Sequence, residues 1–164
     1  QKAFGPIQLH NERFNLHLSF RAILGSLQES QHREMTYHGE NSQICGITDR
    51  ELIEQIVTEL LLNATEATPD GPIDFRWQII SGRLVITIKN SVSESCDDLY
   101  TRFFEPFFST KLGHSGLGLN LARRYSQALG GTIRPIVTPE QVTFAVSLPI
   151  QLDDQTNSHT ERNN

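Results

Sequence analysis

The stretch from Phe103 to Leu119, FFEPFFSTKLGHSGLGL, runs from an aromatic cluster through a lysine into closely spaced glycines. Gly116 and Gly118 lack a Cβ, so the backbone there can turn tightly and approach an anion. The residues that follow, up to Leu129, favour a helix, and the N–H groups of its first turn need an acceptor. A phosphate group supplies one, and Lys111 lies close enough in sequence to reach a terminal phosphate. The stretch therefore predicts either a phosphate-binding loop or an ordinary tight turn before a helix.

The size and composition of the chain are those of one globular domain. Its 164 residues are 37% hydrophobic and 20% charged, and a domain of this length buries roughly 70% of the surface that its unfolded chain exposes. Without an apolar run of about 18 residues or a signal-peptide pattern, the sequence predicts no contact with a membrane. The net charge of −5 and the scattered basic residues argue against a nucleic-acid partner. Cys45 and Cys96 lack metal-site spacing, so we expect reduced thiols and a cytoplasmic location.

A long helix with a polar stripe is predicted after Thr48, where Thr-Asp-Arg-Glu has the form of a capping box. A carboxylate and an amide one turn apart on this stripe, Glu59 and Asn63, can hold a hydrated Mg²⁺ or position a water. The alternative is that the stripe is solvated helix surface. The polar stripe and the apolar arc beside it follow from a period of about 100° per residue. The stripe consists of Gln55, Glu59, Asn63 and Glu66, and the arc of Ile53, Ile56, Val57, Leu60, Leu61 and Ala64.

The other segments predict strands and one further helix. A short strand at residues 14–18 precedes a helix at residues 19–30, with Ser19 as its cap. Residues 35–47 are interrupted by two glycines and predict an extended segment with loops. Further strands are predicted at residues 73–79, 84–88, 132–137 and 142–148, the first two as a hairpin.

This order of elements predicts an α+β fold, a two-layer α/β sandwich in which the helices pack on one side of the sheet. A long loop from about Ser91 to Ser115 separates the hairpin from the last helix and is expected to form a lid. The polar residues from Gln151 onward predict a disordered tail.

The aromatic and glycine-rich stretch resembles the nucleotide lid of the ATP-binding domain of bacterial sensor histidine kinases, members of the GHKL superfamily. FFEPFFSTK is similar to that family's phenylalanine box and HSGLGL to its second glycine box. ELLLNATEA, from Glu59 to Ala67, is similar to its asparagine box. The resemblance implies that residues 14–150 form one domain with the Bergerat ATP-binding fold, which includes a long ATP lid. Residues 1–13 would then lead in from an upstream, dimerisation region, and residues 151–164 would be the tail.

The resemblance also implies a function, two cofactors and a set of site residues. The domain would bind Mg²⁺ and ATP and donate the γ-phosphoryl group to a histidine on a separate dimerisation domain, with a response regulator receiver domain as a further partner. It would work in the cytoplasm, free or as the cytosolic part of a membrane-anchored sensor. Asn63 would coordinate the metal, and Glu59 would position it or act as the general base. The nucleotide-binding positions would be Asn63, Asn90, Phe107, Thr110, Lys111, Ser115, Gly116, Leu117, Gly118 and Leu119.

The sequence departs from the family where adenine would bind. Asn90 takes the position of an aspartate that accepts a hydrogen bond from the adenine amino group, and an amide accepts without the help of charge. A threonine is expected two residues before Phe144, but Val142 is there. Thr143 is out of register by one residue, which in a strand turns its hydroxyl to the opposite face. The phosphate end of the site is therefore expected to be intact and the adenine end altered.

Three functions remain open from the sequence. The first is an enzyme module that transfers a phosphoryl group from Mg·ATP. The second is a pseudokinase or regulatory docking module with weak or no nucleotide binding. The third is an ATP hydrolase that uses Glu59 as its base. Because no histidine has the sequence context of a phosphoacceptor, we expect the chain to be the catalytic fragment of a longer protein.

Overall fold

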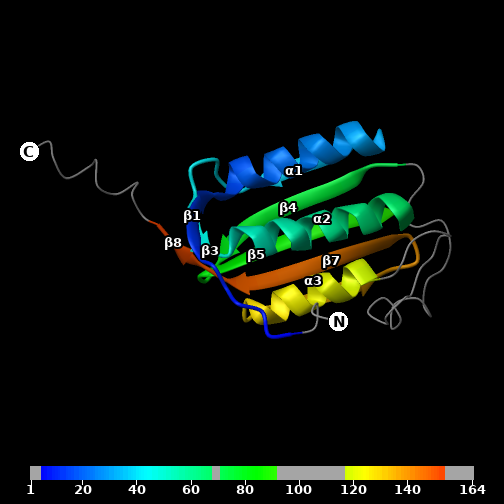
Figure 1. The fold of residues 1–164 in the computed structure, drawn as a ribbon. Coiled ribbons are helices and arrows are strands. Elements are labelled where there is room, and N and C mark those ends of the chain that lie inside the picture. The colour runs from blue at the N-terminus through cyan, green and yellow to red at the C-terminus, as the bar shows by residue number, and fades with distance from the viewer. Residues whose placement is uncertain (1–4, 68–70, 92–116, 154–164) are drawn as a thin grey trace, which may run out of the picture.

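The computed structural model describes residues 5–67, 71–91 and 117–153. In these ranges three helices lie side by side over one face of a five-stranded sheet, with α2 between α1 and α3 (Figure 1). The predicted two-layer α+β sandwich is confirmed. The elements in chain order are β1 Glu12–Asn15, α1 Leu16–Gln31, β2 Met35–Gly39, β3 Cys45–Thr48, α2 Arg50–Ala67, β4 Ile73–Ile80, β5 Arg83–Ser91, α3 Leu117–Ala128, β6 Thr132–Val137, β7 Gln141–Pro149 and β8 Gln151–Leu152.

The large sheet has the strand order β2-β4-β5-β7-β6. β2 pairs parallel to β4, and the other neighbours pair antiparallel. The predicted hairpin is β4 and β5, joined by Ser81 and Gly82, whose φ angles are 49° and 73°. Two left-handed residues are what a tight turn between twisted antiparallel strands requires. The register that this turn imposes carries through to the far end of the hairpin, where Ile73 pairs with Asn90.

Alternation along the strands separates a core face, which faces the helices, from an outer face. On β5 the side chains of Leu84, Ile86 and Ile88 are fully buried against the helices, whereas those between them are half-buried on the outer face. The predicted apolar arc of α2 packs on the core face, and all six of its residues are at most 1% exposed. One hydrophobic core therefore lies between the helix layer and the sheet. None of the helices in the described ranges is long and apolar enough to cross a membrane.

The first helix begins earlier than predicted. β1 ends at Asn15, whose side-chain Oδ1 accepts a hydrogen bond from the backbone N–H of Leu18 at 2.8 Å. Asn15 is therefore the N-cap of α1, and the predictions of a strand to residue 18 and of Ser19 as the cap are wrong. Ser19 is instead buried inside the helix, where its hydroxyl donates to Glu54 Oε1 of α2 at 2.8 Å.

The second helix is capped by Asp49, not by Thr48, which ends β3. Asp49 Oδ1 accepts from the backbone N–H of Leu52 at 3.1 Å, and its Oδ2 accepts from the backbone N–H of His10 at 2.8 Å. The side chain is only 4% exposed, so both bonds satisfy groups that have little access to water. The predicted capping box was one residue out of place, because Asp49 reaches the same N–H groups and binds the N-terminal segment as well.

A small second sheet contains residues that the sequence left as loop or tail. The extended segment predicted at residues 35–47 forms β2 and most of β3, and β3 pairs antiparallel with both β1 and β8. Gln151 and Leu152, which were predicted to belong to the tail, form β8 and pair with Ile47 and Gly46. Residues 154–164 lie outside the described residues.

We expect Leu60→Ala in α2 to lower the free energy of unfolding by about 2–5 kcal/mol, because the side chain is 0% exposed and its removal leaves a cavity in the core. Gln55→Ala, on the exposed side of the same helix, is the control and should change the free energy by less than about 0.5 kcal/mol. Denaturant titration measures both. Equal effects of the two substitutions would mean that the packed face of α2 is assigned incorrectly.

Candidate functional site

The candidate site lies where four elements meet at one end of the sandwich. The C-terminal half of α2, the first turn of α3, the end of β5 and the start of β7 all lie at this end (Figure 1). The strand register brings Asn90 of β5 beside Val142 of β7, and α2 packs against α3. Residues 59–63, 90 and 118 are thus collected from three separate parts of the sequence.

The first turn of α3 approaches α2 at Gly118. A Cβ added to Gly118 would overlap the carboxylate oxygen Oε2 of Glu59 and lie 3.3 Å from its Cδ. The absence of a side chain at Gly118 therefore lets the Glu59 carboxylate lie directly against the start of α3. A helix start carries unpaired N–H groups and a partial positive charge, so this is a favourable place for an anion.

Glu59 and Asn63 lie one turn apart on α2, at the margin of its buried arc. Both side chains are half-buried. Their exposure is intermediate between that of Leu60, which is fully buried, and that of Gln55, which is exposed. Glu66, the last member of the predicted stripe, is also half-buried. The stripe is therefore not an ordinary solvated helix face, because Glu59 and Asn63 are half-buried and Glu59 lies against the start of α3.

Asn90 is a buried polar residue on the core face of β5. It is 2% exposed, and its neighbours across the sheet are Ile73 of β4 and Val142 of β7. Its Nδ2 donates to the backbone carbonyl of Ser91 at 3.2 Å, which orients the amide. A buried amide surrounded by apolar strand residues is well suited to recognise one polar edge of a ligand, because water competes poorly there.

The register also decides where the neighbouring threonine lies. Thr143 pairs with Lys89 and Ile136 on the outer face, whereas Val142 is buried on the core face. The expectation that the hydroxyl of Thr143 is turned away from the site is confirmed. On the core face the two positions nearest the end of the sheet are therefore an amide and a valine.

The remaining predicted site residues belong to the glycine-rich stretch. Leu117 opens α3, and Leu119 is 3% exposed in the core, so its side chain packs under the site and only its backbone could contact a ligand. Phe107, Thr110, Lys111, Ser115 and Gly116, and with them most of the predicted lid, lie outside the described residues.

These residues fit a magnesium-bound nucleotide. Within the described ranges no three or more His, Cys, Asp or Glu side chains come together to hold a metal ion. A Mg²⁺ ion that keeps its waters and takes phosphate oxygens needs only one or two protein ligands, and oxygen atoms from a carboxylate and an amide suit it. Glu59 and Asn63 are residues of these two kinds one turn apart on α2, and Gly118 lets the Glu59 carboxylate lie against the start of α3.

Sequence reasoning missed one contact at this end of α2. The Arg33 guanidinium donates to the backbone carbonyl of Thr65 from Nη1 and to that of Gly71 from Nη2, each at 2.9 Å. Nothing in the pattern around Arg33 indicates it, because Arg33 precedes β2 and its partners lie more than 30 residues further along the chain.

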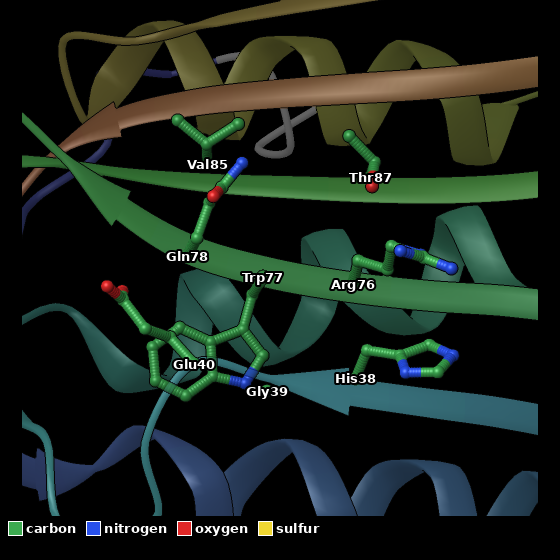
Figure 2. A pocket seen from close by; sticks show the side chains of 8 residues that line it. All are labelled: His38, Gly39, Glu40, Arg76, Trp77, Gln78, Val85 and Thr87. Atoms are coloured by element: carbon green, nitrogen blue, oxygen red, sulfur yellow. The ribbon is translucent and has the colours of Figure 1, made fainter.

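A recess of about 260 Å³ on the outer face of the sheet is distinct from the candidate site. Figure 2 shows His38, Arg76, Gln78, Val85 and Thr87 on the strands, in front of the helices. The recess lies near the end of β2, on the side of the sheet opposite the helices. The sheet and the hydrophobic core therefore separate this recess from the side chains of Asn63 and Asn90.

Asp74 lies on the same face, and its pKa is lowered despite partial burial. Burial by itself would raise the pKa of this carboxyl, but Thr36 donates to it at 2.6 Å and Arg76 at 2.8 Å. The charge of Arg76 and the nearby His38 lower the pKa further. The combined effect of these partners exceeds that of burial, so the ionised form of Asp74 is favoured in the folded protein.

Comparison with known proteins gives a family and several relatives. The model of a family described as histidine kinase-, DNA gyrase B- and HSP90-like ATPase matches residues 48–152. The signal transduction histidine-protein kinase AtoS of Escherichia coli is 36% identical over 105 residues, which are 62% of this chain and 17% of AtoS. The sensory histidine kinase/phosphatase NtrB of Azospirillum brasilense is 28% identical over 118 residues, 62% of this chain and 30% of NtrB. The chain thus spans less than a third of the length of these relatives.

Three solved structures share the fold. The nucleotide-free catalytic domain of histidine kinase ThkA has a TM-score of 0.75 at 26% identity, with 87% of this chain and 96% of that chain covered. ThkA in complex with the response regulator TrrA has a TM-score of 0.72 at 25% identity, over 86% and 42% of the two chains. Full-length ShkA in complex with AMPPNP has a TM-score of 0.80 at 20% identity, over 91% and 33%.

Asp74→Asn tests the lowered pKa of Asp74 through the pH dependence of stability. A carboxyl whose pKa is lower in the folded state stabilises the fold above its unfolded pKa of about 3.8 and loses that effect as the pH falls through the folded pKa. We therefore expect the parent to be more stable than the variant near neutral pH and the difference to shrink below about pH 4. Urea midpoints across this range measure it, and a difference that does not depend on pH would contradict the assignment.

Gly118→Ala tests the contact between α3 and Glu59. The new Cβ should displace the flexible end of Glu59, so we expect ATP affinity to fall by about tenfold or more. Stability should change by less than about 1 kcal/mol, because alanine also favours the helix. Isothermal titration and denaturant titration measure the two quantities.

The matched control is Gly25→Ala on α1, where an added Cβ has nothing within 4 Å. This substitution should stabilise the fold by about 0.5–1 kcal/mol and leave ATP affinity unchanged. If Gly118→Ala behaves like this control, the close approach of Glu59 to α3 has no role in binding.

Proposed function

This chain belongs to the family of histidine kinase-, DNA gyrase B- and HSP90-like ATPases, and we propose that it transfers the γ-phosphoryl group of ATP to a histidine on a separate dimerisation domain. It is an ATP-binding catalytic domain of the histidine kinase type, and its curated relatives are named histidine kinases and sensor proteins. The phosphoryl transfer, its acceptor and the partners of the whole protein are the proposal.

The observation that carries this proposal is the approach of Gly118 to the Glu59 carboxylate, with Asn63 one turn further along α2. In this arrangement the N–H groups at the start of α3 would bind phosphate oxygens, and Asn63 and Glu59 would hold a hydrated Mg²⁺. Mg²⁺ would supply neutralisation of the charge on the phosphates. In this proposal Glu59 would either position the metal or act as the general base that accepts the proton of the attacking group. Positioning and charge neutralisation account for most of the catalysis in phosphoryl transfer.

The adenine end is proposed to use Asn90 in place of a carboxylate. The buried amide can accept a hydrogen bond from the exocyclic amino group of adenine, and the apolar strand residues around it exclude water from that bond. A neutral acceptor makes a weaker bond than a charged one, so we propose that the phosphates and the metal contribute the larger share of the affinity.

The proposed partners are a histidine-bearing dimerisation domain of the same protein and a response regulator receiver domain. The similarity to ThkA, which has been solved in complex with its response regulator TrrA, supports the second partner. The relatives lend no support to the alternative of a pseudokinase or docking module. The hydrolase alternative would use the same Glu59 and differs only in whether water or a histidine receives the phosphoryl group.

Asn63→Ala tests the metal assignment at the centre of the proposal. We expect the variant to lose magnesium-dependent ATP binding and to keep its fold, because Asn63 lies at the margin of the packed arc and not in it. Isothermal titration with ATP, in the presence of Mg²⁺ and then of EDTA, measures the metal-dependent part of the affinity for parent and variant.

Gln55→Ala is the matched control, since Gln55 is an exposed amide in the same stripe. It should bind Mg·ATP as the parent does. Equal affinities of the parent and the Asn63 variant would remove Asn63 from the metal site. A parent that binds no ATP at millimolar concentration would overturn the proposed function itself.

A further inference from the structure

Arg33 links the C-terminal end of α2, the helix that carries Glu59 and Asn63, to the start of β4 by two hydrogen bonds. Its planar guanidinium donates through Nη1 to the carbonyl of Thr65 and through Nη2 to the carbonyl of Gly71, each at 2.9 Å. Thr65 belongs to the last turn of α2, and Gly71 lies just before β4. One side chain from the N-terminal part of the chain therefore fixes the distance between two backbone positions on either side of residues 68–70.

The backbone next to Arg33 is itself held in place. α1 ends at Gln31 and is capped by His32, whose φ of 50° is left-handed and turns the chain out of the helix. Immediately after Arg33, the carbonyl of Glu34 accepts from the backbone N–H of Ile73 at 3.2 Å, at the point where β2 begins to pair with β4. Arg33 thus projects from a rigid corner toward α2.

The end of α2 needs such a partner. The last carbonyl groups of a helix have no partner within the helix and carry a partial negative charge, which a cation stabilises. α2 has no basic residue in its own last turn. Within that turn the hydroxyl of Thr65 donates to the carbonyl of Leu62 at 2.7 Å, while Arg33 binds the carbonyl of Thr65. The two bonds together restrain the turn that contains Asn63.

We propose that Arg33 is a positioning residue for the metal and phosphate site: by its two bonds to Thr65 and Gly71 it holds the last turn of α2, and therefore the amide of Asn63, in the place where Mg·ATP binds. This inference rests on the proposed function. It requires the forked geometry of arginine, because a lysine ammonium is a point charge that does not bridge two carbonyl groups in a fixed orientation.

Arg83 serves as the control that distinguishes a positioning role of Arg33 from a purely structural one. It makes two similar hydrogen bonds at a place remote from the candidate site. Arg83 donates from Nε to Ser147 Oγ at 2.7 Å and from Nη2 to the carbonyl of Ser147 at 3.2 Å. Both arginines are half-buried. Arg83 opens β5, whereas Asn90 lies at the other end of that strand. Loss of either arginine should therefore cost similar stability, and only Arg33 should affect the nucleotide.

The experiment compares Arg33→Gln and Arg33→Lys with Arg83→Gln and Arg83→Lys. We expect both Arg33 variants to weaken Mg·ATP binding by about tenfold, the size seen when an outer support of a metal site is removed. Binding in EDTA should change by less than about twofold, because Asn63 acts through the metal, and the Arg83 variants should bind as the parent does. Amide exchange of residues 62–66 should be faster in the Arg33 variants only. Arg33→Lys keeps the charge, so it serves if Arg33→Gln does not fold.

A double-variant cycle with Asn63→Ala separates this inference from the proposed function. If Arg33 acts through Asn63, Arg33→Gln should leave the residual ATP affinity of Asn63→Ala unchanged. The inference is overturned if a parent that binds Mg·ATP is matched by its Arg33 variants, if the Arg83 variants lose as much affinity, or if the losses persist in EDTA. A parent that does not bind Mg·ATP overturns the proposed function, and the inference with it.

Discussion

The burial of one arc of α2 against the large sheet determines where every other part of the candidate site lies. Six apolar side chains of this helix are at most 1% exposed, so the helix can neither rotate nor slide without opening the core. With the helix held in that way, Glu59 and Asn63 must lie at the margin between core and solvent. Glu59 lies there against the start of α3, and Asn63 is half-buried one turn further along the same helix.

The contact between Gly118 and Glu59 depends on that rigidity. A glycine at the first turn of α3 costs helix stability, since glycine loses more conformational freedom than alanine on folding. What it allows is a carboxylate in direct contact with a helix start, in a place where any side chain would displace it. The glycine thus lowers the stability of α3 locally and leaves room for the Glu59 carboxylate. The burial of α2 and α3 against the sheet offsets that loss.

Both ends of α2 are held by side chains whose other partners lie in distant parts of the chain. Asp49 caps the first turn and at the same time binds the backbone of His10. Arg33 binds a carbonyl of the last turn and at the same time Gly71. Because each side chain has two partners, the helix that carries Glu59 and Asn63 is tied to the N-terminal segment and to the start of β4. The bonds of Asp49 to His10 and of Arg33 to Thr65 and Gly71 could not be predicted from the local pattern. The predicted caps Ser19 and Thr48 were wrong for a related reason. Several polar residues near a helix start can reach its N–H groups, and tertiary contacts select one of them.

The sequence by itself determined the fold class, the hairpin, the buried arc of α2 and the polar stripe with Glu59 and Asn63, because periodicity and short motifs are local properties of the chain. Asn90 became a candidate site residue only through the resemblance to the histidine kinase family. It also determined that Thr143 lies on the opposite face of its strand from Val142 and Phe144, since side chains alternate along a strand. Only the tertiary structure decided that Glu59 lies against Gly118, that Asn90 is buried between Ile73 and Val142, and that Arg33 supports the end of α2. Apart from the pairing of Asn90 with Ile73 inside the hairpin, these contacts join residues 32 or more positions apart. Their distances follow from the packing of helices on a sheet, which no local pattern records.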